Sequence, residues 1–151
     1  MVYNALIRSH LDYMLPVWGA CKKDILSKIK CKQKRAVQLV CGIRDNMEHS
    51  SPLFKGCGFL KLEDMYKLSA LKFSFKSQTQ ELPIFEKRHN VNTRENVRNN
   101  LSLPDVIPSS QRRMPLICLP QVWNSASEQI KSATSKKNIS SHVYLEYLSS
   151  Y

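Results

Sequence analysis

The chain has 151 residues, of which 42% are hydrophobic and only four are glycine, so it can bury a core and form one ordinary domain. Its 23 Lys and Arg residues against 12 Asp and Glu give a formal net charge of +11. This charge makes nucleic acid the leading class of partner, with a merely solubilising basic surface as the alternative. No apolar run approaches the ~18 residues of a membrane span, so we expect an intracellular protein, cytoplasmic or nuclear, without a membrane partner.

Residues 2–15 carry apolar side chains at helical spacing and predict an amphipathic helix that ends before Pro16. Trp18 follows at a predicted corner. We expect Trp18 to fill the core where two helices meet, and stacking on a nucleotide is the less favoured interpretation.

Residues 25–42 predict a helix that says more about function than any other stretch of the chain. Gly42 stands where a left-handed cap would end it. At about 100° per residue the expected apolar side is made of Ile25, Leu26, Ile29, Ala36, Val37, Leu39 and Val40. The flanks and back carry Lys23, Lys28, Lys30, Lys34 and Arg35.

After a predicted loop over 45–58, with one helical turn at 52–55, residues 62–76 predict a helix with two apolar faces, which is typical of a central helix between neighbours. Glu63 and Asp64 fall in its first turn, where negative charge complements the helix dipole.

From residue 77 onward the pattern weakens. Residues 81–120 predict an irregular linker or extended segment, within which the apolar run 116–119 is expected as a single strand or an extended piece laid on the helices. Helical spacing returns over 121–130 and 140–150. The expected fold is all-α, a small bundle of about five helices with an extended Pro- and Asn-rich excursion, in which residues 121–151 pack on the helical region 1–80.

No catalytic group emerges from the sequence. The acidic residues are scattered, whereas metal-dependent polymerisation needs paired aspartates, and no phosphate-binding glycine loop or nucleophile motif is present. The five cysteines include no C-x-x-C pair, and the spacing of Cys41, His49 and Cys57 matches no common zinc pattern. We therefore expect free thiols, no metal, no cofactor and no enzymatic activity of the chain alone.

Two basic clusters are the candidate binding residues. Lysines on a helix suit contacts to phosphates rather than readout of bases, and arginines can fork onto phosphates. The alternatives are a solvated helix face for the first cluster and a disordered charged segment for the second. The predicted nucleic-acid contacts are Lys28, Lys30, Lys34 and Arg35, with Arg94, Arg98, Arg112 and Arg113 as the second set.

Five separated motifs, in this order and approximate spacing, resemble the region after the palm in reverse transcriptases of LINE-type, jockey-like non-LTR retrotransposons. They are Leu6-Ile7-Arg8-Ser9-His10-Leu11-Asp12-Tyr13 with Val17-Trp18-Gly19, Gln33-Lys34-Arg35-Ala36-Val37, Pro52-Leu53-Phe54 with Leu60-Lys61-Leu62-Glu63-Asp64-Met65-Tyr66, His89-Asn90-Val91-Asn92-Thr93-Arg94, and Pro120-Gln121-Val122-Trp123-Asn124.

The resemblance implies that residues 3–42 correspond to thumb helices that grip a template-primer duplex, RNA or RNA/DNA, through its backbone. The palm and its aspartates would lie upstream, which adds the upstream polymerase domains as a further partner. Near Trp123 the sequence departs from the family pattern, with Leu119 in place of a usual Gly and Ala126-Ser127 in place of Leu-Pro.

Two other hypotheses remain open at this point. The chain is a protein-interaction or assembly module, or it is a transposon relic without a selected function. In the first of these, the aromatic residues expected to pack against missing domains are Tyr66, Phe73, Phe75, Trp123, Tyr144 and Tyr147.

Overall fold

The computed structural model describes residues 2–43, 50–79, 85, 99–104 and 107–151. The fold is all-helical, as predicted. Within the described residues the elements are, in chain order, a π-helical turn η1 (Asn4–Arg8) and the α-helices α1 (Ser9–Asp12), α2 (Leu15–Trp18), α3 (Lys23–Val40), α4 (Ser50–Cys57), α5 (Leu62–Gln78), α7 (Pro115–Asn124), α8 (Glu128–Lys131) and α9 (Lys136–Ser149).

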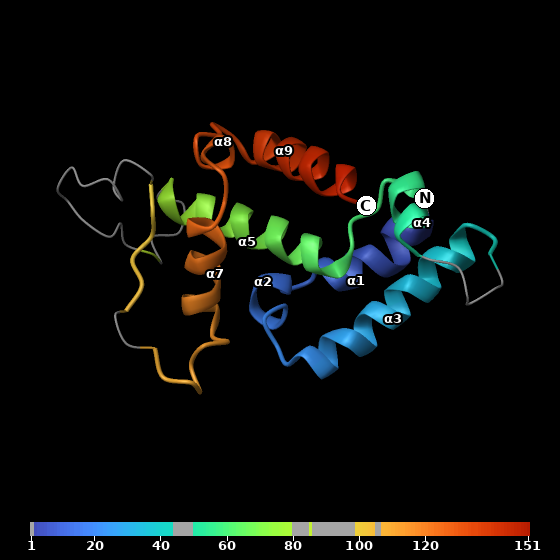
Figure 1. The fold of residues 1–151 in the computed structure, drawn as a ribbon, viewed down its shortest axis with the longest axis horizontal. Coiled ribbons are helices and arrows are strands. Elements are labelled where there is room, and N and C mark those ends of the chain that lie inside the picture. The colour runs from blue at the N-terminus through green and yellow to red at the C-terminus, as the bar shows by residue number, and fades with distance from the viewer. Residues whose placement is uncertain (1, 44–49, 80–84, 86–98, 105–106) are drawn as a thin grey trace.

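Helix α5 lies at the centre of the molecule and packs against α1, α2, α7 and α9 (Figure 1). The two-faced pattern of residues 62–76 therefore predicted its position correctly. The main core joins side chains from both ends of the chain. Its fully buried members include Leu15, Leu62, Leu71, Leu101, Trp123, Ile139 and Val143.

A second, smaller core lies where α3 meets the N-terminal turn and α4. It contains Tyr3, Val37, Phe54 and Phe59, with the rings of Tyr3 and Phe59 stacked at a centroid distance of 4.1 Å. This second core therefore fixes α3 and α4 to the N-terminal turn.

The core-facing side of α3 differs from the predicted one. Ile25, Leu39 and Val40, expected on the apolar side, are 51%, 62% and 48% exposed, whereas the polar Gln33 is only 3% exposed. The side that packs inward is centred on Leu26, Ile29, Gln33 and Val37. The prediction was therefore correct for Leu26, Ile29, Ala36 and Val37, which pack in the cores, and wrong for the three exposed residues, because it considered only apolar residues for the core.

Gln33 is tolerated in the core because its amide is fully used. Its Nε2 group donates to the Tyr3 hydroxyl and to the Leu60 carbonyl, each at 3.0 Å, and its Oε1 atom accepts the backbone N–H of Leu62 at 2.9 Å. A buried polar group that is hydrogen-bonded in this way carries little net penalty. Gln33 therefore joins α3, the N-terminal turn and the start of α5.

The end of α3 confirms the predicted glycine cap. Gly42 adopts φ +74°, and the N–H groups of Gly42 and Ile43 donate to the carbonyls of Leu39 and Gln38. These two bonds define a Schellman motif. Glycine adopts the left-handed conformation that this motif requires without steric strain.

The N-terminal segment is broken where one helix was predicted. Helix α1 ends at Asp12 because Tyr13 is extended, and Met14, at φ +50°, begins a new turn. Pro16 lies in the first turn of α2 instead of terminating a helix. Proline is well accommodated in a first turn, where its missing N–H is not needed. Trp18 is half-buried and packs on the main core, in agreement with its predicted role, and its Nε1 donates to the Tyr13 carbonyl at 2.7 Å.

A glycine allows α2 to approach α5 closely. A Cβ atom on Gly19 would lie 2.2 Å from Cδ2 of Tyr66 and 2.7 Å from the Leu15 carbonyl oxygen. Such contacts are sterically forbidden, so position 19 accepts no larger side chain without movement of α2 or the Tyr66 ring.

The run 116–119 is helical, and the predicted strand or extended segment is wrong. Pro115 occupies the first turn of α7, where its fixed φ favours a helix, and Pro120 is accommodated inside α7. The helix predicted over 121–130 is also interrupted, because α7 ends at Asn124 and α8 begins at Glu128.

Two neighbouring residues of α7 hold the segment 99–101 against the bundle. Trp123 Nε1 donates to the Asn99 carbonyl at 2.8 Å. The Asn124 side chain pairs with both backbone groups of Leu101, accepting its N–H at 2.8 Å and donating to its carbonyl at 3.0 Å. The fully buried Leu101 side chain enters the main core as a result.

Helices α4 and α9 are longer than the sequence predicted. Helix α4 spans eight residues where one turn was expected, and α9 begins at Lys136, four residues before the predicted start. The Ser135 side chain caps α9 by accepting the Asn138 N–H at 3.3 Å.

Candidate nucleic-acid interface

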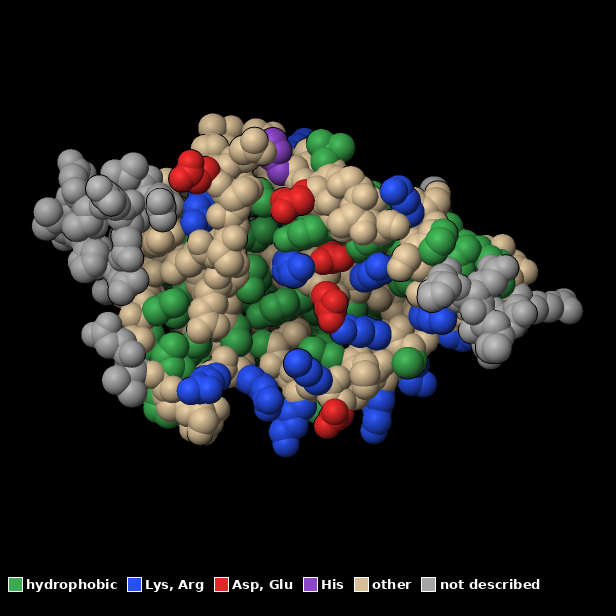
Figure 2. All heavy atoms as spheres, in the orientation of Figure 1, with side chains coloured by type: hydrophobic (Ala, Val, Ile, Leu, Met, Phe, Trp, Pro, Cys, Tyr) green, Lys and Arg blue, Asp and Glu red, His purple; other side chains and the backbone are tan. Residues whose placement is uncertain are grey.

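Three cations form one line along the solvent side of α3. Lys28, Lys32 and Arg35 are all exposed and follow one another at intervals of four and three residues, which places them on one helix face about 10 Å long. We call these three residues the outer stripe. Figure 2 shows Lys and Arg side chains gathered along the lower edge of the molecule, over α3 and toward the start of α7.

Two cations of the outer stripe, Lys28 and Lys32, have no carboxylate partner among the described residues. Helix α3 contains six cations and one carboxylate, Asp24. Lys32 was missing from the predicted contacts. Its position four residues after Lys28 and three before Arg35 is the sequence signal that could have identified it.

Lys30 and Lys34 lie on a different flank of the helix. Both are half-buried, and with Lys61 they surround a hollow of about 220 Å³ whose floor includes Phe54 and Leu62. The four predicted contacts on α3 therefore divide into two pairs. Lys28 and Arg35 face outward, whereas Lys30 and Lys34 face α4 and α5.

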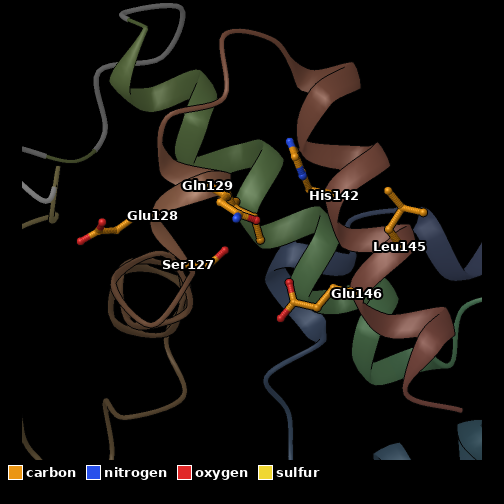
Figure 3. A pocket seen from close by; sticks show the side chains of 7 residues that line it. Ser127, Glu128, Gln129, His142, Leu145 and Glu146 are labelled. Atoms are coloured by element: carbon orange, nitrogen blue, oxygen red, sulfur yellow. The ribbon is translucent and has the colours of Figure 1, made fainter.

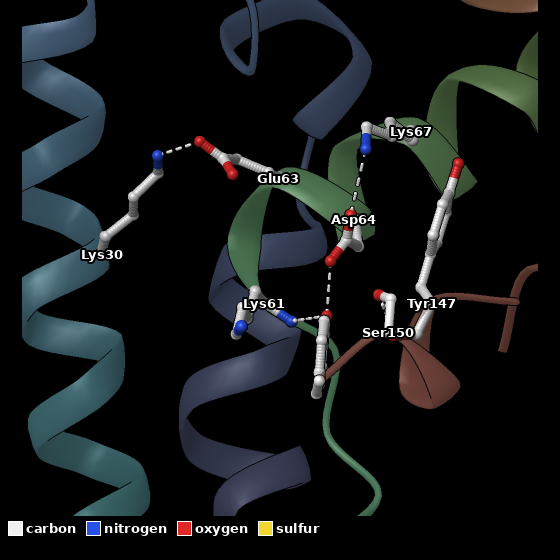
Figure 4. A network of polar contacts seen from close by, with 8 residues as sticks. Lys30, Lys61, Glu63, Asp64, Lys67, Tyr147 and Ser150 are labelled. Atoms are coloured by element: carbon white, nitrogen blue, oxygen red, sulfur yellow. Dashed lines mark hydrogen bonds and ion pairs between the residues drawn. The ribbon is translucent and has the colours of Figure 1, made fainter. Parts of the chain in front are cut away.

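Lys30 is engaged with α5. Its ammonium group donates to the Glu63 carboxylate, which comes from the first turn of α5 (Figure 4). The hydrogen bond from Lys30 lowers the pKa of Glu63, so that carboxylate stays ionised and offsets the Lys30 charge. Lys34 has no such carboxylate among the described residues.

The same turn of α5 carries a second polar cluster. The Tyr151 hydroxyl donates to Asp64 and accepts the Lys61 N–H at 2.9 Å, while Lys67 pairs with Asp64 at 3.2 Å (Figure 4). The Lys61 ammonium group also lies 4.0 Å from the centroid of the Tyr151 ring, within the range of a cation–π contact. These groups are bound within the protein and hold the start of α5 in place.

The second predicted cluster is described only in part. Arg112 and Arg113 are exposed just before α7, as binding residues would need to be. Arg94 and Arg98 lie outside the described residues.

A hollow of about 800 Å³ lies between α8 and α9 and has acidic and imidazole groups on its walls (Figure 3). Ser127, Glu128, His142 and Glu146 line it, yet no hydrogen bond joins any two of them, and all four are exposed. In Figure 3 Glu128 points away from His142. These four side chains therefore form no hydrogen-bonded pair of nucleophile and base in this structure.

Neither a metal cluster nor a membrane span is found in the described part of the chain. No group of three or more His, Cys, Asp or Glu side chains there is arranged to hold a metal ion, and no helix there is long and apolar enough to cross a bilayer.

The six aromatic residues proposed for contact with missing domains pack within the chain instead. Trp123 is fully buried, and the other five are half-buried. The apolar side chains that the N-terminal segment exposes are different ones, namely Val2, Leu6, Tyr13, Met14 and Val17.

Comparison with known proteins gives no relative: no protein-family model matches the chain, and neither a curated protein nor a solved structure is significantly similar to it.

Proposed function

We propose that this chain binds nucleic acid through the phosphate backbone, without reading sequence, and that the outer stripe is the main contact. One observation carries the proposal: three exposed cations form a straight line on the side of α3 opposite its core face. A duplex presents a dense row of negative charge, and cations that replace its condensed counterions gain free energy from their release.

The remaining predicted cations extend this contact. Lys34 offers a further ammonium group on the flank of α3 that faces α4 and α5, and Arg112 and Arg113 offer two guanidinium groups beside the start of α7. In this proposal the chain grips a template-primer duplex, RNA or RNA/DNA, as the thumb of a retrotransposon reverse transcriptase would, while polymerisation takes place on domains outside this sequence.

The test is fluorescence anisotropy with a labelled RNA/DNA hybrid at several salt concentrations. The slope of log K against log salt should become less steep by about one for each phosphate that the protein no longer neutralises, hence by about two in Lys28→Ala/Lys32→Ala. The matched control is Lys55→Ala/Lys137→Ala, which removes the same charge from exposed positions on α4 and α9. Equal slopes for the two double variants, or no binding at low salt, would contradict the proposal.

The second candidate is a protein-interaction module, and the exposed apolar residues of the N-terminal segment favour it. Leu6 and Tyr13, at 61% and 76% exposed, would then contact the upstream polymerase domains or a second copy of the chain. Light scattering would show self-association that Leu6→Ser/Tyr13→Ser abolishes. A monomer at all concentrations, with salt-dependent binding of nucleic acid, would exclude self-association and favour the first candidate.

A further inference from the structure

Two thiols that are 16 residues apart in the sequence meet in the second core. The Sγ atoms of Cys41 and Cys57 lie 3.0 Å apart and share a hydrogen bond. Cys41 follows the last residue of α3, and Cys57 is the last residue of α4. Both side chains are half-buried and pack beside Phe54 and Phe59.

The other three cysteines have no sulfur partner within the described residues. The thiol of Cys21 donates to the Lys22 carbonyl at 3.8 Å and that of Cys118 to the Arg112 carbonyl at 3.0 Å, while Cys31 is exposed on α3. The pairing is therefore specific to the two helix ends.

We propose that Cys41 and Cys57 form a reversible disulfide that fastens α4 to the end of α3 when the protein meets a hydroperoxide. A disulfide needs a sulfur–sulfur distance of about 2.0 Å, so the two atoms have to approach by about 1 Å, which side-chain rotation can supply. The bond would close a ring of chain between two helices that already pack together.

The chemistry balances with one hydroperoxide molecule. The Cys57 thiolate attacks a peroxide oxygen, the O–O bond breaks, and Cys57 becomes a sulfenic acid as the leaving oxygen takes up a proton. The Cys41 sulfur then attacks the Cys57 sulfur, its own proton leaves with the displaced hydroxide as water, and the S–S bond forms. Two thiols and one hydroperoxide give one disulfide, one alcohol and one water, and hydrogen peroxide gives two waters instead.

The roles of the two sulfurs follow from their contact. The hydrogen bond with the Cys57 thiol, together with burial, raises the pKa of Cys41 to about 11, so Cys41 stays protonated at neutral pH. A protonated thiol attacks peroxide poorly, so Cys41 is assigned as the resolving group.

The first test uses the variant Cys21→Ser/Cys31→Ser/Cys118→Ser, which retains only the pair. After treatment with hydrogen peroxide, peptide mapping should recover a linked peptide with Cys41 and Cys57, two hydrogen atoms lighter than the reduced peptides and split by dithiothreitol. Dimers linked between molecules, or sulfinic acids with no linked peptide, would overturn the proposal.

The second test is thermal unfolding of the same variant before and after oxidation. A ring of this size should raise Tm by about 5 °C or more. Further substitution of Cys57 by Ser is the control, since peroxide should leave its Tm unchanged. An unchanged Tm in the linked protein would show that the bond does not fasten native helices and would refute the proposed role.

Discussion

The side-chain oxygen of Gln33 accepts the backbone N–H of Leu62 at 2.9 Å and so caps α5 from a helix 29 residues earlier in the chain. Lys61, the residue that precedes α5, makes no side-chain cap of its own. Helix N-termini leave backbone donors that need partners, and this donor is buried, where water cannot serve. Helix α3 therefore completes the hydrogen bonding of the central helix.

Gln33→Ala should lower the free energy of unfolding by about 2–4 kcal/mol, because it leaves the Leu62 N–H and the Tyr3 hydroxyl buried without their partner. Urea denaturation followed by circular dichroism measures this decrease. The control is Gln121→Ala, an exposed position on α7, which should change stability by less than about 0.5 kcal/mol. Similar decreases in both variants would show that the Gln33 amide has no special role.

Asn124→Ala should destabilise the protein by about 1–2 kcal/mol, since it removes both hydrogen bonds to the backbone of Leu101. Hydrogen exchange would show faster exchange of the Leu101 amide than in the wild type. Asn138→Ala, an exposed position on α9, is the matched control and should leave that amide protected. An unaltered exchange rate in Asn124→Ala would contradict the assigned bond.

Glu63→Gln should strengthen binding of nucleic acid. The substitution removes the carboxylate that offsets Lys30, so the anisotropy titration should show a salt slope steeper by about one. Stability should change by less than about 1 kcal/mol, because the pair is exposed to solvent. Glu128→Gln, on α8, makes the same change of charge away from α3 and serves as the control. Weaker binding by Glu63→Gln would contradict this prediction. It would show that Lys30 contacts nucleic acid only when its ion pair with Glu63 positions it.

Tyr66→Phe tests how the free energy of unfolding decreases at alkaline pH. The Tyr66 hydroxyl is buried without a hydrogen-bond partner among the described residues, and burial raises the pKa of this group to about 12. In the unfolded chain the tyrosine ionises near pH 10, so the folded state binds more protons between about pH 10 and 12, and stability falls as the pH rises through that range.

The phenylalanine variant should lose less stability than the wild type above pH 10 and match or exceed it at pH 7, where it removes a buried hydroxyl that has no partner. Urea titrations at a series of pH values between 7 and 11 measure both effects. Superimposable pH profiles for the two proteins would refute the assignment.

The helices with strong periodicity were predictable from the sequence, and α3 and α5 were placed within two residues of their ends. The face of α3 was not predictable, because Gln33 is buried through partners that lie 27 to 30 residues away in the sequence. The helix α7 was missed for a local reason: its prolines were interpreted as breakers, although Pro115 starts the helix.

The candidate site was predictable in charge but not in geometry. The sequence placed Lys28, Lys30 and Arg35 in one group on the flanks and back of the helix. That Lys30 turns toward α5 depends on Glu63, 33 residues later, and no local pattern reports such a pair.

The two sides of α3 have an evolutionary consequence. Substitutions at Lys28 or Lys32 leave the bonds of Gln33 intact, so selection for folding alone would let the outer positions drift while it preserved the inner ones. In a set of diverged copies of this sequence, cations retained at positions 28, 32 and 35 would mark selection for binding. Random replacement at these three positions, with Gln33 and Val37 unchanged, would indicate selection for the fold without selection for binding.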